Sequence, residues 1–188
     1  MAPLFDHLTA VFLGGAVLLL LGSVWLQNST SAIQSTEAYQ QRTRAEALRV
    51  TLDQDFAAIG RDVPPGETAI VALTDIGATW TFEFRGRISA PAGQPPDWVR
   101  YTATSQTCGA ATCRRLRRFV WTGTAFAPAG LDLDVSSFRI VPAVSSPLDA
   151  STSLDLRVVL LPAGRSTAPP ATIDRRYRLV NQELRSAP

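Results

Sequence analysis

The sequence predicts an α+β fold, in which a long N-terminal helix packs on an antiparallel β-sheet head of about six or seven strands. Three observations lead to this prediction: an uncharged apolar run near the N-terminus, an apolar stripe at helical spacing directly after it, and a change to two-residue alternation with frequent prolines. We expect residues 1–27 to be the transmembrane part of the helix. Residues 28–60 would form its exposed amphipathic part, and residues 61–188 a β-rich head outside the cytoplasm.

The apolar run extends from Leu8 to Leu26 and contains no charged residue. A helix over this run would be about 28 Å long, which is enough to cross the hydrocarbon core of a bilayer. Trp25 lies at its end, where an indole suits the membrane interface. We therefore predict a single-pass anchor. The alternative is a secretory signal that is cleaved at the small residues 30–32.

The stripe that follows predicts that the same helix continues outside the membrane. Its apolar residues recur at spacings of three, four and seven, which places them on one helical face. Gly60 is suited to the C-terminal cap, and Pro64 and Pro65 forbid continuation, so we predict one helix from about Phe5 to Ile59. The stripe consists of Ala38, Ala45, Leu48, Leu52, Phe56 and Ile59.

Beyond the helix, short alternating segments separated by prolines predict β-strands. Residues 79–85 show the clearest alternation, with three aromatic side chains on one face. The connections are short, and short connections join antiparallel neighbours. The expected strands are residues 69–73, 79–85, 98–104, 116–122, 131–141, 154–161 and 177–184.

The composition argues against an enzyme. All 18 basic residues are arginine and His7 is the one histidine, so the chain lacks the lysine of a P-loop or Schiff base and the histidines of a catalytic triad or zinc protease. We expect no catalysis and no cofactor. The net charge of +2 is too small to indicate a nucleic-acid-binding protein by itself.

Cys108 and Cys113 flank a short segment that contains a glycine, and can meet across a hairpin turn. A disulfide there would place the head in an oxidising compartment. The alternative is a pair of small buried thiols. A zinc site is disfavoured, because nothing else in the sequence supplies suitable further ligands.

A strip of arginines follows the second cysteine. Such a strip could contact DNA or anionic lipid headgroups. The alternative is a solvated strand face, or a contact for an acidic partner subunit. The residues are Arg114, Arg115, Arg117 and Arg118.

The order of these segments resembles the type IV pilin superfamily, in particular minor pilins and minor pseudopilins of the PilW/GspJ type. The helix end at residues 52–64 and the strand at residues 80–84 carry the resemblance. So do residues 99–101, 113–119 and 133–140. The resemblance extends over nearly the whole chain and rests on order and spacing.

The resemblance implies a structural subunit of an envelope filament, either a pilus or a secretion pseudopilus. Its partners would be the lipid bilayer and other pilin-like subunits. It would be held in the bacterial inner membrane, with the head in the periplasm or outside the cell. The alternative is an anchored or secreted binding module for DNA, glycan or protein. Leu13, Val17, Leu20 and Leu21 are the residues expected to pack against neighbouring helices.

In this family a glutamate near the helix start pairs with the amine of a neighbouring subunit. Asp6 is the acid nearest to the apolar run, and would set the assembly register in its place. The alternative is an interfacial aspartate that interacts with the helix dipole. The family's basic leader and Gly-Phe junction are not evident, which leaves two explanations: a start upstream of Met1, or a subunit processed in another way.

Overall fold

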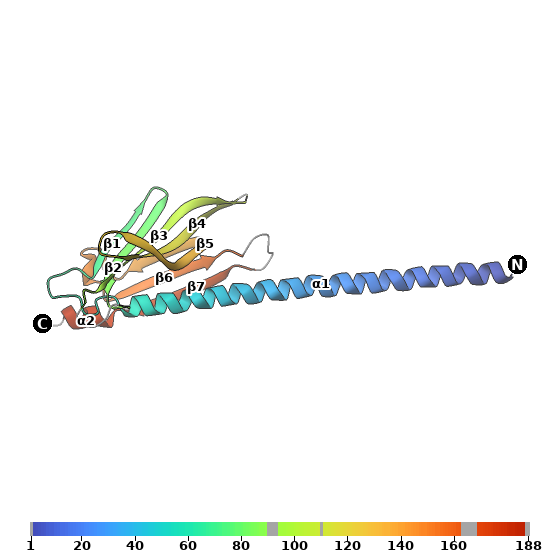
Figure 1. Ribbon diagram of the computed structural model, residues 1–188, viewed down its shortest axis with the longest axis horizontal. Coiled ribbons are helices and arrows are strands. Elements are labelled where there is room, and N and C mark those ends of the chain that lie inside the picture. Colours follow the sequence, from blue (N-terminus) through green and yellow to red (C-terminus); the bar gives the residue numbers. More distant parts are fainter. Residues whose placement is uncertain (1, 90–93, 110, 163–168, 187–188) are drawn as a thin grey trace.

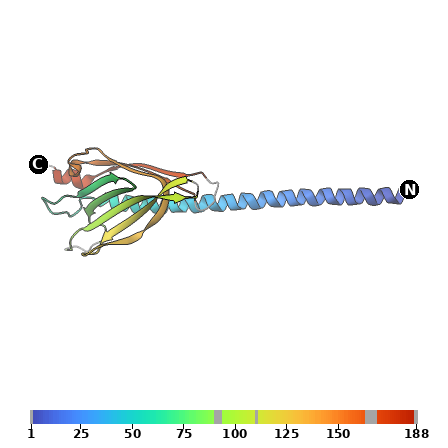
Figure 2. The ribbon, with the colours of Figure 1, turned by 90° about the horizontal axis from the view of Figure 1, so that it is seen from above.

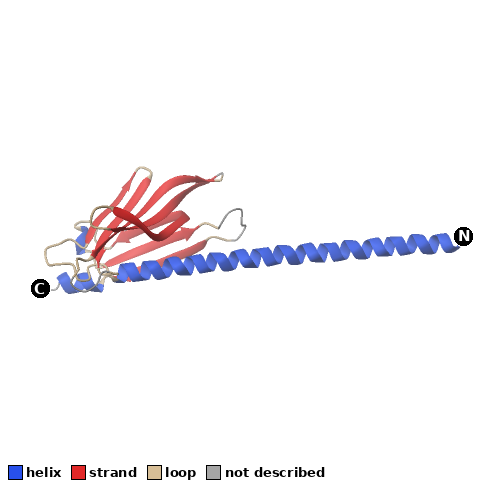
Figure 3. Ribbon diagram, in the orientation of Figure 1, coloured by secondary structure: helices blue, strands red, loops and turns tan. Residues whose placement is uncertain are grey.

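The protein consists of a long helix and a curled sheet beside one end of it (Figures 1 and 3). The computed structural model describes residues 2–89, 94–109, 111–162 and 169–186. The first half of the helix extends away from the sheet without touching it (Figure 1). This arrangement confirms the predicted α+β fold.

Helix α1 (Ala2–Ala57) is continuous across the predicted membrane and head portions. Its 56 residues give a length of about 84 Å. The predicted stripe is confirmed in the second half, where Leu48, Leu52 and Phe56 are at most 1% exposed; Ile59, which lies just past the helix end, is buried as well. Gly60 follows with a φ of 76°, the left-handed conformation that suits a glycine after a helix end.

The sheet is a seven-stranded antiparallel meander in which each strand pairs with its neighbours in sequence. Its strands are β1 (Ile70–Ile76), β2 (Thr79–Gly86), β3 (Asp97–Cys108), β4 (Ala111–Trp121), β5 (Phe126–Pro142), β6 (Ser153–Leu160) and β7 (Ala171–Arg178). A short 3-10 helix, η1 (Leu148–Ala150), lies between β5 and β6.

The long strand β5 divides the sheet into two parts. Its first half pairs with β4 and its second half with β6, and the register shifts between Val135 and Ser137. The strands curve, and the second half of α1 lies close to β6 and β7 (Figures 1 and 2). The core fills the space between the helix and the sheet.

Aromatic side chains dominate this core. The ring of Phe56 meets the rings of Phe82, Phe84, Tyr101 and Tyr177 edge to face, with centroid distances from 4.8 to 6.2 Å. These partners come from three strands, β2, β3 and β7. One helical side chain therefore joins both parts of the sheet.

The prediction of a last strand at residues 177–184 is wrong. β7 lies earlier in the chain, and residues 180–186 form the short helix α2 (Val180–Ser186). Leu179 is buried, its N–H donates to Thr152 O, and its carbonyl accepts the N–H groups of Gln182 and Glu183. These bonds turn the chain out of the sheet and into a helical turn.

Candidate functional site

The apolar half of α1 carries most of the exposed large hydrophobic side chains that the structure describes. Leu13, Val17, Leu20 and Leu21 have exposed fractions of 60%, 53%, 66% and 62%. None of the apolar window of this helix is buried, and its mean hydropathy is 2.1, so α1 is a candidate membrane span. The four predicted packing residues are thus free of the head. Asp6 lies in α1, but its side chain is outside the described part of the chain, so its role in register stays a prediction.

The other half of α1 is fastened to the head by a buried ion pair. Asp55 is 1% exposed. Its carboxylate accepts hydrogen bonds from Arg118 Nε and Nη2, at 2.6 and 2.9 Å, and from the Tyr101 hydroxyl at 2.5 Å. A carboxylate taken out of water needs such donors. No role was predicted for Asp55 from the sequence; its place between Leu52 and Phe56, inside the apolar stripe, was the available signal.

Two tyrosine hydroxyls also bond the helix to the head, and burial changes the pKa of both. Burial, together with the neighbouring carboxylate of Asp55, raises the pKa of the Tyr101 phenol well above its usual value. Burial also raises the pKa of Tyr177, whose hydroxyl donates to Asp53 Oδ1 at 2.7 Å. Both phenols remain protonated donors to carboxylates of α1, so hydrogen bonds from β3 and β7 hold the same helix.

The end of α1 is held by backbone contacts. Gly60 N donates to Arg85 O at 2.9 Å, and Ile59 forms an antiparallel bridge with Gly86. The Asn181 side chain donates to the carbonyl oxygens of Ala57 and Ile59 at 2.9 and 3.2 Å. The last carbonyl groups of a helix lack partners within it, and Asn181 of α2 supplies a donor to one of them, Ala57 O, and to Ile59 O just beyond the helix end.

The predicted arginine strip does not form one surface. Arg118 turns inward to Asp55, and 13% of its side chain is exposed. The expectation that Arg118 contacts an outside anion is therefore corrected, because its guanidinium is already bound by a buried carboxylate. Arg114 is half-buried and lies between Ser105 and Val135 in the register.

Arg115 and Arg117 are exposed, but they share one carboxylate. Arg115 donates two hydrogen bonds to Asp132, at 2.6 and 2.8 Å, and Arg117 Nε lies 3.6 Å from the same residue. Hydrogen bonding from Arg115 lowers the pKa of Asp132. The acid comes from the neighbouring strand β5, 15 residues beyond Arg117 in the sequence. The role of Arg115 and Arg117 as contacts for an outside anion stays a prediction.

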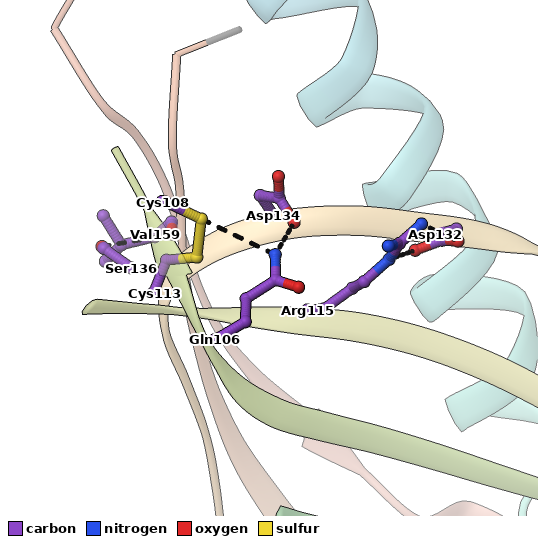
Figure 4. Close-up of a disulfide and its surroundings, with 8 residues drawn as sticks. All are labelled: Gln106, Cys108, Cys113, Arg115, Asp132, Asp134, Ser136 and Val159. Atoms are coloured by element: carbon purple, nitrogen blue, oxygen red, sulfur yellow. Dashed lines mark hydrogen bonds and ion pairs between the residues drawn. A yellow bond between two sulfur atoms is a disulfide. The ribbon is translucent and has the colours of Figure 1, made fainter. Parts of the chain in front are cut away.

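The disulfide between Cys108 and Cys113 is confirmed, with 5.7 Å between the Cα atoms. It closes the end of the β3–β4 hairpin (Figure 4). The Gln106 amide lies beside it and donates to Asp134 at 2.6 Å (Figure 4). These sulfurs and Asp134 form the one metal-like cluster among the described residues, but the disulfide removes the thiolates that a metal would need.

Comparison of the chain with models of protein families, with curated proteins and with solved structures finds no match.

Proposed function

We propose that the protein is a membrane-anchored, pilin-like structural subunit of a bacterial envelope filament. The observation that carries the proposal is the division of α1 into two halves: the apolar half touches nothing in the described chain, and the other half is locked into the head. A helix of this kind can rest in lipid and later pack against the helices of neighbouring subunits.

The contacts that fix the second half of α1 to the head support a mechanical role for the helix. The Asp55 ion pair, the Phe56 ring contacts and the cap from Asn181 fix the orientation of the head on α1. A rigid joint transmits the position of the membrane half to the head. Packing of neighbouring helices would then determine which head surfaces meet.

Photo-crosslinking tests this function in the membrane that contains the protein. A benzophenone amino acid is placed at Leu20, and a matched one at Arg139, which is exposed on the sheet. We expect the Leu20 variant to crosslink to the apolar helix of a neighbouring filament subunit, identified by mass spectrometry. The Arg139 variant controls for crosslinking through the head.

Two outcomes would contradict the proposal. One is a Leu20 probe that reacts with lipid alone, including in filaments sheared from the cell surface. The other is an intact mass showing that the native protein is cleaved after Ala32, because the polymerising helix would then be lost. Either result would favour the binding module. In that case the full chain should shift the gel mobility of duplex DNA, and the double variant Arg115→Gln with Arg117→Gln should not. This pair of results would identify DNA as the ligand of the binding module.

A further inference from the structure

A groove of about 950 Å³ lies between α1 and the start of β7. Its size is in the range of sites that bind ligands or peptide segments. Side chains from both elements line it, and most of them are small or apolar. The floor consists of Ala45, Ala47, Val50, Ala171 and Ile173.

One wall of this groove is an edge strand. β7 is the last strand in the sheet and pairs with β6 alone among the described strands. Alternate residues of an edge strand direct their N–H and C=O groups away from the sheet. Near its far end β7 is bonded to the helix through Tyr177 and Asp53, whereas residues 171–173 border the groove. An extended segment could therefore add to the first half of β7.

The charges around the groove are mostly positive. Arg42 and Arg49 line it from the helix side. Arg175 projects from β7, and its charge is felt at the Tyr177 phenol together with that of Arg49. The nearby carboxylates are already bound, since Glu46 accepts from Arg49 and Asp53 accepts from the Tyr177 hydroxyl.

Two of these three arginines retain free donors. No ion pair joins Arg42 or Arg175 to an acid in the described part of the chain, whereas Arg49 is bound to Glu46 and its unpaired Nε is buried. A guanidinium binds carboxylates through charge-assisted hydrogen bonds. The groove therefore offers backbone groups on one wall, an apolar floor and unused cationic donors at its rim.

We propose that this groove binds an extended, acidic segment of a partner protein as an added strand beside β7. The backbone of the segment would pair with the free edge, alternate apolar side chains would cover the floor, and carboxylates would meet Arg42 and Arg175. The proposal goes beyond the filament function, because it concerns the head and not the apolar half of α1.

Binding of two designed peptides to the full chain in detergent micelles tests the proposal. The probe is a fluorescent octapeptide of alternating valine and glutamate, and its matched control alternates valine and lysine. Fluorescence anisotropy measures both affinities. We expect the glutamate peptide to bind more tightly by on the order of tenfold or more, since one charge-assisted hydrogen bond accounts for roughly that factor.

Charge reversal locates the site. Arg42→Glu with Arg175→Glu should invert the preference, so that the lysine peptide binds more tightly. The control, Arg139→Glu with Arg157→Glu, makes the same change at two exposed arginines directly opposite each other on β5 and β6, and should leave the preference as it is. If the first variant loses its cooperative thermal unfolding, Arg42→Gln with Arg175→Gln replaces it, with a loss of preference expected.

Amide hydrogen exchange of the unmodified protein gives a second readout. The glutamate peptide should slow exchange within residues 171–173. Equal affinities for the two peptides, an effect of the control variant equal to that of the groove variant, or protection confined to other strands would overturn the proposal. So would sedimentation showing that the parent chain is a dimer and the Arg42→Glu with Arg175→Glu variant a monomer, because a second copy would then occupy the groove. The Leu20 crosslinking experiment tests the filament function, and its result does not depend on any of these outcomes.

Discussion

Asp55 supplies the carboxylate of the buried ion pair that joins the helix to the head. Replacing it by alanine leaves the Arg118 guanidinium in a mostly buried place without its carboxylate. We expect Asp55→Ala to lower the free energy of unfolding by about 3–5 kcal/mol. Chemical denaturation of the full chain in detergent micelles measures this.

The double variant Asp55→Ala with Arg118→Met serves as the control for this prediction. It removes both charges and keeps an apolar side chain of similar length, so it should cost less than Asp55→Ala alone. A double variant at least as unstable as the single one would show that packing, and not the unpaired charge, is responsible.

Tyr101 should make the folding stability of the head decrease at alkaline pH. Its usual pKa is 10.0, and the fold raises it, so the folded protein retains a proton that the unfolded chain releases. The stabilisation is complete below about pH 10 and is lost as the pH rises further through the folded-state pKa.

Thermal unfolding between pH 8 and 11 checks this prediction. Tyr101→Phe should be less stable at pH 8, where the hydrogen bond to Asp55 is lost, but should lose less stability on going to pH 11. Tyr39→Phe is the control, because Tyr39 is 71% exposed and should leave the slope unaltered. An equal alkaline loss in the parent and in Tyr101→Phe would refute the assignment.

Single residues differ in how far the sequence could predict them. Leu48 and Leu52 follow the helical period, and the disulfide follows from a short spacing. Asp55 and Arg118 could not be paired in this way, because 63 residues separate them and each type is usually solvated. The pairing of Asp132 with Arg115 was missed because the two residues lie 17 positions apart, on the neighbouring strands β5 and β4, and meet only through the strand register.

At the scale of elements, the close approach of the end of β2 to the segment just after α1 depends on the absence of a side chain at Gly86. A Cβ atom on Gly86 would lie 1.9 Å from the carbonyl oxygen of Ala58. Gly86→Ala should therefore separate the strand from the helix end and cost about 1–3 kcal/mol. Denaturant unfolding measures the loss. Gly22→Ala is a matched control, because nothing lies within 4 Å of its Cβ position, and an equal loss there would contradict the steric explanation.

The strands show where two-residue alternation of apolar and polar residues is enough to predict a β-strand from the sequence. β2 alternates between buried and half-buried residues throughout, and its predicted bounds, 79–85, differ from the observed strand by one residue. β7 has a single fully buried position, Ile173, because its outer face is charged and its inner face borders α1 and the groove. Edge strands bury less than central strands, so their period is weaker.

For the whole molecule, the two halves of α1 should be energetically independent. Among the helix residues whose burial the structure describes, the buried positions begin at Gln41, and none of the apolar window upstream is buried. Deleting residues 1–32 should leave the thermal midpoint of the head unchanged and abolish its flotation with membranes. A lower midpoint would reveal contacts between the apolar half and the head, and retained flotation would place the membrane-binding surface elsewhere.

The meander also sets an order of folding. Each strand pairs with the strand before it, so the sheet can grow hairpin by hairpin from local contacts. The bonds that join α1 to the far side of the sheet, Tyr177 to Asp53 and Asn181 to Ala57, bridge 124 residues. During synthesis the helix is made first and acquires these partners last. Until β7 and α2 emerge, the side of α1 that packs against β7 remains uncovered. Early insertion of the apolar half into the bilayer would keep nascent chains apart during that interval.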